Sequence, residues 1–297
     1  MINVVAKIRS EPMTCVVERA RAALDAGCAQ LVLGQSFYLP EWTELLGLVP
    51  SRAVLGVELF VPLPRQLHPP AACPFRLGGS SVEEKRDAIK YGTETLQQAS
   101  RHEIQFAQLP LVDLEIEGVP PRRLTDEEYE RFSRRRTTAA EVRMDSYLST
   151  LDSLLTQADD HDVTLVITPG AILNDFPNHV EAAHILHEFA GAPLAVWPDI
   201  VGETRAANRQ LESSWDLYGE AIGGIVLSEV APSGFRCLPG TGELDWDAWK
   251  SPLAESAHWI IDVPPCSSVE EIAAAREFLI GVCEESEPDD GLFSVPG

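Results

Sequence analysis

Short apolar runs and amphipathic stretches alternate along the whole chain. The runs at 4–8 and 163–167 are rich in β-branched residues, which is typical of buried strands. Ala, Val and Leu recur at helical spacing over 14–26 and 139–158. Gly27 follows the first of these helices and can end it in a left-handed turn. The pattern therefore predicts strand–helix units that repeat along the sequence.

Eight such units can be counted. Strands that alternate with helices form a parallel sheet, and eight units close it into a barrel. No GxGxxG follows the first strand, which argues against an open dinucleotide-binding sheet. We predict a (β/α)8 TIM barrel in one domain over 1–285, followed by a loosely held tail at 286–297. The other strands are expected at 31–33, 53–60, 104–109, 194–197, 224–227 and 259–263. One further helix is expected to begin at a cap formed by Ser80 and Ser81 and to end at about 100. The remaining helices are expected at 40–48, 179–190, 205–218, 246–255 and 269–284.

The amino-acid composition limits the classes of binding partner that we expect. The formal net charge is -23, with 46 Asp and Glu against 23 Lys and Arg. Nucleic acids and anionic membranes bind basic surfaces, so we expect neither as a partner. The apolar runs are shorter than a membrane span, the first residues turn polar too soon for a signal peptide, and the six cysteines lack metal-ligand spacing. These features predict a cytoplasmic protein with reduced cysteines.

Four motifs occur in the order found in one family of barrels. LPGTGELDWDAW at 238–249 resembles the PGEGxIDW loop after the seventh strand of the xylose isomerase-like barrels, the sugar phosphate isomerase/epimerase superfamily that includes AP endonuclease family 2. The stretches at 22–33, 78–89 and 163–202 are similar to its AAxAGFDGVEL, SxDxExRxxAI and VTLxLEN…LDxGH patterns. The resemblance covers almost the whole chain and implies a xylose isomerase-like fold.

The resemblance also implies a divalent metal at the barrel mouth, held by carboxylates and a histidine. Transferred to this chain, the ligand set is incomplete. Thr168 falls in place of the fifth-strand glutamate, Gly202 in place of the DxGH histidine, and Val226 near the seventh-strand histidine. Asp199 and Asp262 remain as the two carboxylates. We expect no tightly bound cofactor, with weakly held, mostly hydrated Mg²⁺ or Mn²⁺ on these two residues as the alternative.

Three carboxylates near predicted strand ends are the acid/base candidates: Asp199, Asp262 and Glu229. The structural alternative is that the aspartates cap helices or pair with arginines. Three further residues are candidates for binding substrate: Arg236, Thr168 and Trp246. Arg236 can grip a carboxylate or phosphate, or simply neutralise its neighbours. The tryptophans are otherwise core residues.

Two other clusters favour a structural interpretation. The segment 110–136 is long, charged and contains prolines, and we expect it to run over one face of the barrel. The Arg-rich run at 131–143 could steer an anionic substrate into the barrel mouth. A solvated helix start next to the acidic residues of 126–130 explains the run better. His179, His184 and His187 share a helix predicted to face away from the mouth. We expect them at the surface or partly buried rather than on a metal.

The sequence supports three functional hypotheses. The first is an isomerase or epimerase that moves a proton on a small polyhydroxylated or keto substrate, without the usual tightly bound metal. The second is a non-catalytic descendant that binds a metabolite or a protein. The third, an endonuclease IV-like nuclease, needs a histidine-rich metal cluster and a basic face, and the sequence suggests neither. A homodimer is a further expectation for this fold.

Overall fold

A computed structural model describes residues 3–8, 16–34, 39–50, 52–60, 77–79, 81–114, 116, 118, 125–207, 213–232 and 236–284; the predicted tail lies outside these ranges. Its eight-stranded parallel sheet runs in the order β8-β6-β4-β3-β2-β1-β12-β9. Isolated parallel bridges from Val196 to Ile222 and from Asp199 to Val226 join the two edges into a barrel. This confirms the predicted fold class. The strands are β1 (Val4–Ile8), β2 (Gln30–Leu33), β3 (Val54–Glu58), β4 (Phe106–Gln108), β6 (Thr164–Ile167), β8 (Leu194–Val196), β9 (Ile225–Leu227) and β12 (Trp259–Asp262).

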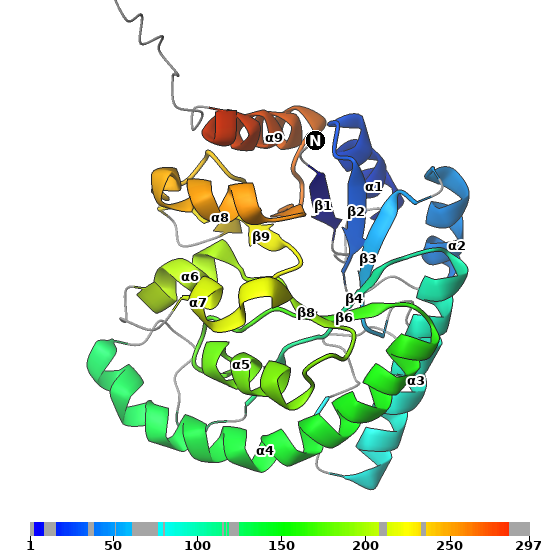
Figure 1. The fold of residues 1–297 in the computed structure, drawn as a ribbon. Coiled ribbons are helices and arrows are strands. Elements are labelled where there is room, and N and C mark those ends of the chain that lie inside the picture. The colour runs from blue at the N-terminus through cyan, green and yellow to red at the C-terminus, as the bar shows by residue number, and fades with distance from the viewer. Residues whose placement is uncertain are drawn as a thin grey trace, which may run out of the picture.

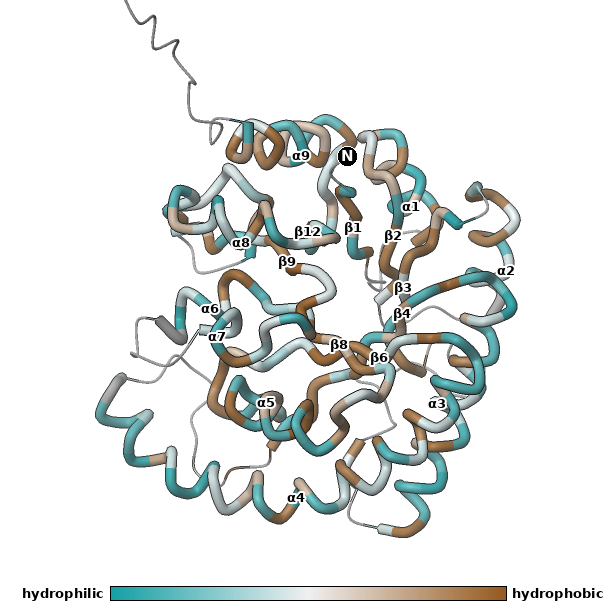
Figure 2. The backbone as a smooth tube through the Cα atoms, viewed as in Figure 1, coloured by the Kyte–Doolittle hydropathy of each residue, from teal (hydrophilic) through white to brown (hydrophobic). Residues whose placement is uncertain are grey.

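The helices form a ring around the strands (Figure 1). Figure 2 shows the strands as largely hydrophobic, while the helices carry hydrophilic segments around the outside. Among the described helices, none combines the length and the apolarity needed to cross a membrane. The ring comprises α1 (Val16–Asp25), α2 (Leu39–Leu48), α3 (Val82–Arg101), α4 (Asp126–Asp160), α5 (His179–Glu188), α6 (Ile200–Ala207), α7 (Ser214–Tyr218), α8 (Lys250–Glu255) and α9 (Val269–Glu284).

The barrel interior is filled by a separate apolar cluster that includes Val5, Leu55, Val166, Trp197 and Ile260. The Trp197 indole occupies much of this space. A Cβ on Gly56 would lie 3.2 Å from its ring and 3.3 Å from the Phe106 Cβ, so the glycine gives the indole room. Because strand residues alternate between the two faces, the residues two positions after Val5, Val166, Trp197 and Ile260 also point inward. On β3 the pairing with β2 shifts register, and the inward residue Glu58 follows Gly56 by two positions. These inward residues form the functional end of the barrel.

The prediction that the segment 110–136 runs over one face as an excursion is wrong for the second half of the segment. Helix α4 begins at Asp126, because Thr125 and Glu128 form a capping box in which each side chain accepts a hydrogen bond from the other's backbone N–H. The Arg-rich run therefore lies within α4, which confirms the helix-start interpretation. In the first half, β5 (Val112–Asp113) pairs antiparallel with β7 (Asp175–Phe176).

The predicted helix over 205–218 is also wrong. Asp199 Oδ1 accepts hydrogen bonds from the N–H groups of Val201 and Gly202, at 2.9 and 3.2 Å, and so starts α6 at Ile200. Ser213 caps a second, separate helix, α7. Side-chain caps, which periodicity does not detect, set both boundaries.

Candidate functional site

One inward-facing residue from each barrel strand, or from one to three positions after it, makes a layer at the C-terminal end of the barrel. We call it the polar layer. Barrels of this fold carry their chemistry at this end. Although polar or charged, Lys7, Glu58, Gln108, Asp199, Ser228 and Asp262 are all buried. The layer comprises Lys7 (β1), Gly34 (after β2), Glu58 (β3), Gln108 (β4), Thr168 (after β6), Asp199 (after β8), Ser228 (after β9) and Asp262 (β12).

Lys7 organises one half of the polar layer. Its Nζ lies 2.7 Å from Glu58 Oε1 and donates a hydrogen bond to Gln108 Oε1 at 2.5 Å. Gln108 Nε2 in turn donates to Thr168 Oγ1 at 2.7 Å. Strands β2 and β3 separate β1 from β4 in the sheet, so the Lys7–Gln108 bond crosses the barrel interior. Half of the layer is thus a continuous network anchored by a buried ion pair.

Arg236 organises the other half. It lies on β11 (Arg236–Cys237), which pairs antiparallel with β10 (Glu229–Val230). Its Nη1 is 2.6 Å from Asp199 Oδ2 and 3.3 Å from Asp262 Oδ2, and it donates to Ser228 Oγ at 3.1 Å. The structure therefore brings together Asp199, Asp262 and Arg236 around one nitrogen atom.

Arg236 remains charged in this position. Desolvation lowers the pKa of its guanidinium, but the carboxylates of Asp199 and Asp262 outweigh that effect and raise the pKa above its ordinary value. The side chain is nevertheless 40% exposed. It borders a hollow of about 440 Å³ lined by residues 236–241, 264–267 and α9. Arg236 is thus the accessible member of a mostly buried site.

Glu229 and Trp246 lie together in a different contact. Glu229 is 1% exposed, and its two carboxylate oxygens accept hydrogen bonds from the Gly242 N–H and the Trp246 indole N–H. The Trp246 ring is buried and packs edge-on against Phe278. These contacts hold the PGTG loop against the barrel. They favour structural roles for both residues.

The donor set does not fit a divalent metal. Among the residues that the structure describes, no three His, Cys, Asp or Glu side chains are grouped as metal ligands. The two carboxylates that the resemblance retains, Asp199 and Asp262, converge on Arg236 Nη1 instead. A guanidinium in that position repels a cation and uses the oxygen lone pairs that the cation needs.

Asp175 on β7 adds another carboxylate close to this end of the barrel. Its Oδ2 accepts hydrogen bonds from the N–H groups of Ala171 and Ile172, both at 3.0 Å. Burial raises the pKa of Asp175, although these two hydrogen bonds and Arg136 act in the opposite direction. A Cβ on Gly170 would lie 2.0 Å from the Asp175 Cβ, so this turn requires glycine.

The histidines are divided between surface and core. His184 and His187 are exposed on α5, as predicted. The expectation for His179 is wrong, because it is 5% exposed. Its Nδ1 lies 3.2 Å from Ser214 Oγ and 3.3 Å from Glu203 Oε1, where α5 packs against α6 and α7. The buried carboxylate and hydroxyl are partners for Nδ1, whereas Nε2 is buried without a hydrogen-bond partner among the described residues. None of the three belongs to the polar layer.

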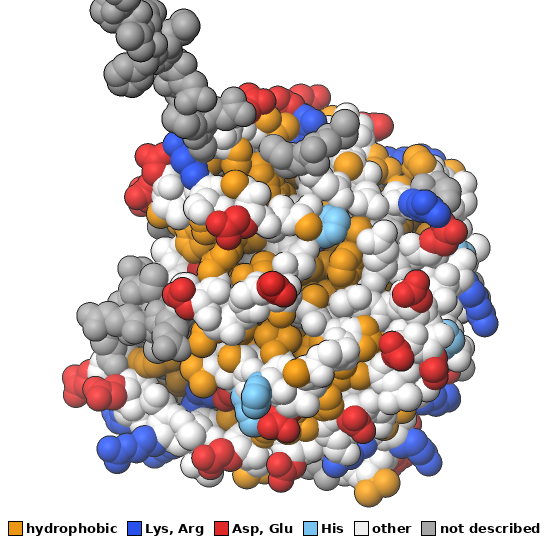
Figure 3. All heavy atoms as spheres, in the orientation of Figure 1, with side chains coloured by type: hydrophobic (Ala, Val, Ile, Leu, Met, Phe, Trp, Pro, Cys, Tyr) orange, Lys and Arg blue, Asp and Glu red, His pale blue; other side chains and the backbone are white. Residues whose placement is uncertain are grey.

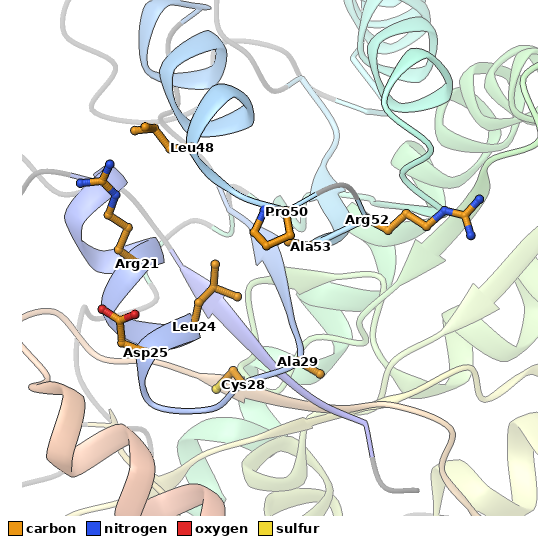
Figure 4. A pocket seen from close by; sticks show the side chains of 9 residues that line it. All are labelled: Arg21, Leu24, Asp25, Cys28, Ala29, Leu48, Pro50, Arg52 and Ala53. Atoms are coloured by element: carbon orange, nitrogen blue, oxygen red, sulfur yellow. The ribbon is translucent and has the colours of Figure 1, made fainter.

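The opposite end of the barrel carries a larger hollow. Its volume is about 560 Å³, and residues at the ends of α1 and α2 and just before β2 and β3 line it (Figure 4). In Figure 4 the Arg52 side chain extends away from the hollow; its Nε is 2.8 Å from Glu103 Oε2, and both side chains are exposed. Burial raises the pKa of the Cys28 thiol to about 11, so this lining thiol stays protonated.

Sequence reasoning identified part of the polar layer. It selected Asp199, Asp262, Arg236 and Thr168, which lie in the two networks. It missed the Lys7–Glu58 pair together with Gln108. A charged residue inside an apolar strand, in phase with its inward positions, was the available signal: Lys7 follows Val5 by two residues.

Comparisons with known proteins support the fold. No family model matches the chain, and no curated protein matches it. Among solved structures, the apo 3-keto-D-glucoside 4-epimerase of E. coli has a TM-score of 0.66 at 10% identity and covers 95% of this chain and 100% of its own. The IolI protein with bound zinc has a TM-score of 0.66 at 14% identity, covering 96% and 99%. The AP endonuclease, family 2, from Brucella melitensis has a TM-score of 0.63 at 15% identity, covering 94% and 99%. The chain thus shares the (β/α)8 barrel fold of these proteins, as the sequence pattern predicts.

Proposed function

We propose that this protein is an isomerase- or epimerase-type enzyme. It would act on a small polyhydroxylated or keto substrate by proton transfer, without a tightly bound divalent metal. The observation that supports the proposal is the polar layer together with Arg236, which place two cations and three carboxylates at the C-terminal end of a xylose isomerase-like barrel. Proton abstraction next to a carbonyl needs a base and a stabilised oxyanion, and the layer contains both kinds of group.

The contacts suggest different roles for the two aspartates. Asp199 is engaged on both oxygens, by the α6 backbone and by Arg236 at 2.6 Å, so we assign it to positioning Arg236. Asp262 meets Arg236 at the longer distance of 3.3 Å, and we assign it as the base. Lys7 and Arg236 would stabilise the negative charge that develops on the substrate oxygen, and Thr168 would bind a substrate hydroxyl.

The test is hydrogen exchange in D₂O. Protein freed of metal by a chelator is incubated with a panel of ketoses, aldoses and 3-keto-glucosides, and proton NMR follows loss of the signal at the carbon next to the carbonyl. We expect exchange with at least one compound and a loss of about 10²-fold or more in Asp262→Asn. Undiminished exchange in Asp262→Asn would refute its role as the base, and exchange only after adding metal would refute the metal-free mechanism.

The second candidate is a non-catalytic binding protein. It is favoured by the pairing of Asp199, Asp262 and Glu58 with cations, which engages carboxylate oxygens that a base would need for the substrate proton. A sugar that raises the melting temperature but shows no deuterium exchange would favour it. A nuclease receives little support. In Figure 3, acidic and basic side chains mingle around the rim of the described surface, without a continuous basic area on that face. The predicted homodimer stays a prediction, to be checked by light scattering.

A further inference from the structure

Three oxygen atoms converge on the Arg236 Nη1 nitrogen. Asp199 Oδ2, Ser228 Oγ and Asp262 Oδ2 lie 2.6, 3.1 and 3.3 Å away. Two carboxylates and a hydroxyl are the hard ligands that Mg²⁺ and Mn²⁺ prefer, although those ions need oxygens at about 2.0–2.2 Å. The positive charge that these three oxygens contact comes from the Arg236 side chain and not from a metal ion.

We propose that the Arg236 guanidinium is a built-in and removable substitute for a divalent cation. In the intact protein it holds the Asp199–Ser228–Asp262 position and excludes metal. Without it, the same three oxygens form a cation site. The inference deepens the proposed function by identifying what neutralises the two aspartates, but it does not require turnover.

The oxygens belong to the barrel, whereas Arg236 does not. Asp199 and Asp262 have side chains only 8% and 7% exposed, and Ser228 is fully buried. All three follow or end strands of the eight-stranded sheet. A rigid sheet with its own hydrogen bonds should keep these oxygens close together when the arginine is replaced.

Arg236 comes instead from a peripheral element. Strand β11 belongs to a two-stranded ladder with β10, separate from the barrel sheet, and the arginine side chain is 40% exposed beside the hollow of about 440 Å³. A cation can therefore reach the position from solvent. Lys7 differs, because its side chain is 3% exposed and comes from a barrel strand. Of these two cations, Arg236 is the one that can be removed with least damage to the fold.

The test is Mn²⁺ binding, measured from the free-Mn²⁺ signal in electron paramagnetic resonance. Wild type should show no saturable site up to millimolar Mn²⁺. Arg236→Met should bind one Mn²⁺ with a Kd of about 10⁻⁴ to 10⁻³ M, the weak end for oxygen-ligated cations, and at least tenfold more tightly than wild type. Adding Asp262→Asn to the variant should remove the gain. Arg52→Met, which changes an exposed arginine at the other end, should behave as wild type.

Two results would overturn the proposal. One is a wild-type protein that binds Mn²⁺ as tightly as Arg236→Met. The other is an arginine variant with native circular dichroism and no gain in Mn²⁺ affinity; Arg236→Gln provides this measurement if the Met variant does not fold. Because no substrate is present, a negative result leaves the deuterium-exchange test unaffected. A failed exchange test likewise leaves the Mn²⁺ result valid.

Discussion

The two ends of the barrel differ in the exposure of their charged side chains. At the C-terminal end, Lys7, Glu58, Asp199 and Asp262 are buried and bonded to other members of the site. At the N-terminal end, the charged side chains around the larger hollow remain exposed to water, as Arg52 does. The larger hollow is therefore not the better candidate site. Burying a charge is costly, so a cluster of buried charges indicates a site more strongly than an empty volume does.

The largest expected effect comes from breaking the buried ion pair. Lys7→Met leaves the Glu58 carboxylate, 10% exposed, without its partner at 2.7 Å. We expect a loss of about 3–5 kcal/mol in the free energy of unfolding, because one member of a buried ion pair would be removed from a low-dielectric interior. Urea denaturation followed by circular dichroism measures this change.

The matched control is the double variant Lys7→Met/Glu58→Met. Replacing both members of a buried pair with apolar side chains of similar size is often close to neutral. We therefore expect the double variant to recover most of the lost stability. If it is no more stable than the single variant, the loss would come from packing rather than from the broken ion pair.

A smaller effect should follow from crowding the turn after β6. Gly170→Ala places a Cβ 2.0 Å from the Asp175 Cβ, so that turn must shift, at a cost of about 1–3 kcal/mol. Gly47→Ala in α2 is the matched control, because no atom lies within 4 Å of its added Cβ. That control should be neutral or gain up to about 1 kcal/mol. Equal melting temperatures for the two variants would contradict the predicted crowding.

The sequence predicted the barrel but only part of its site, for a physical reason. The alternation of apolar strands and amphipathic helices is a long-range pattern repeated eight times, so local errors did not change the fold. The boundaries of α4 and α6 depend on single capping side chains, Thr125 and Asp199. A cap by Asp199 was the structural alternative to a catalytic role, yet both helices were expected to begin later than they do. The Lys7–Glu58 pair joins strands that are distant in sequence, and no local pattern reveals such a partner.

The smallest expected effect is at the N-terminal end. Arg52→Ala removes an exposed pair with Glu103, whose side chains are 74% and 59% exposed. Water and salt screen such a pair, so we expect no measurable change in melting temperature and an unchanged sugar-induced shift. Calorimetry with and without the sugar found in the exchange screen would measure both. If Arg52→Ala abolished that shift while Arg236→Met kept it, the ligand would bind at the N-terminal hollow. The burial of charged side chains would then not identify the ligand-binding end of this barrel.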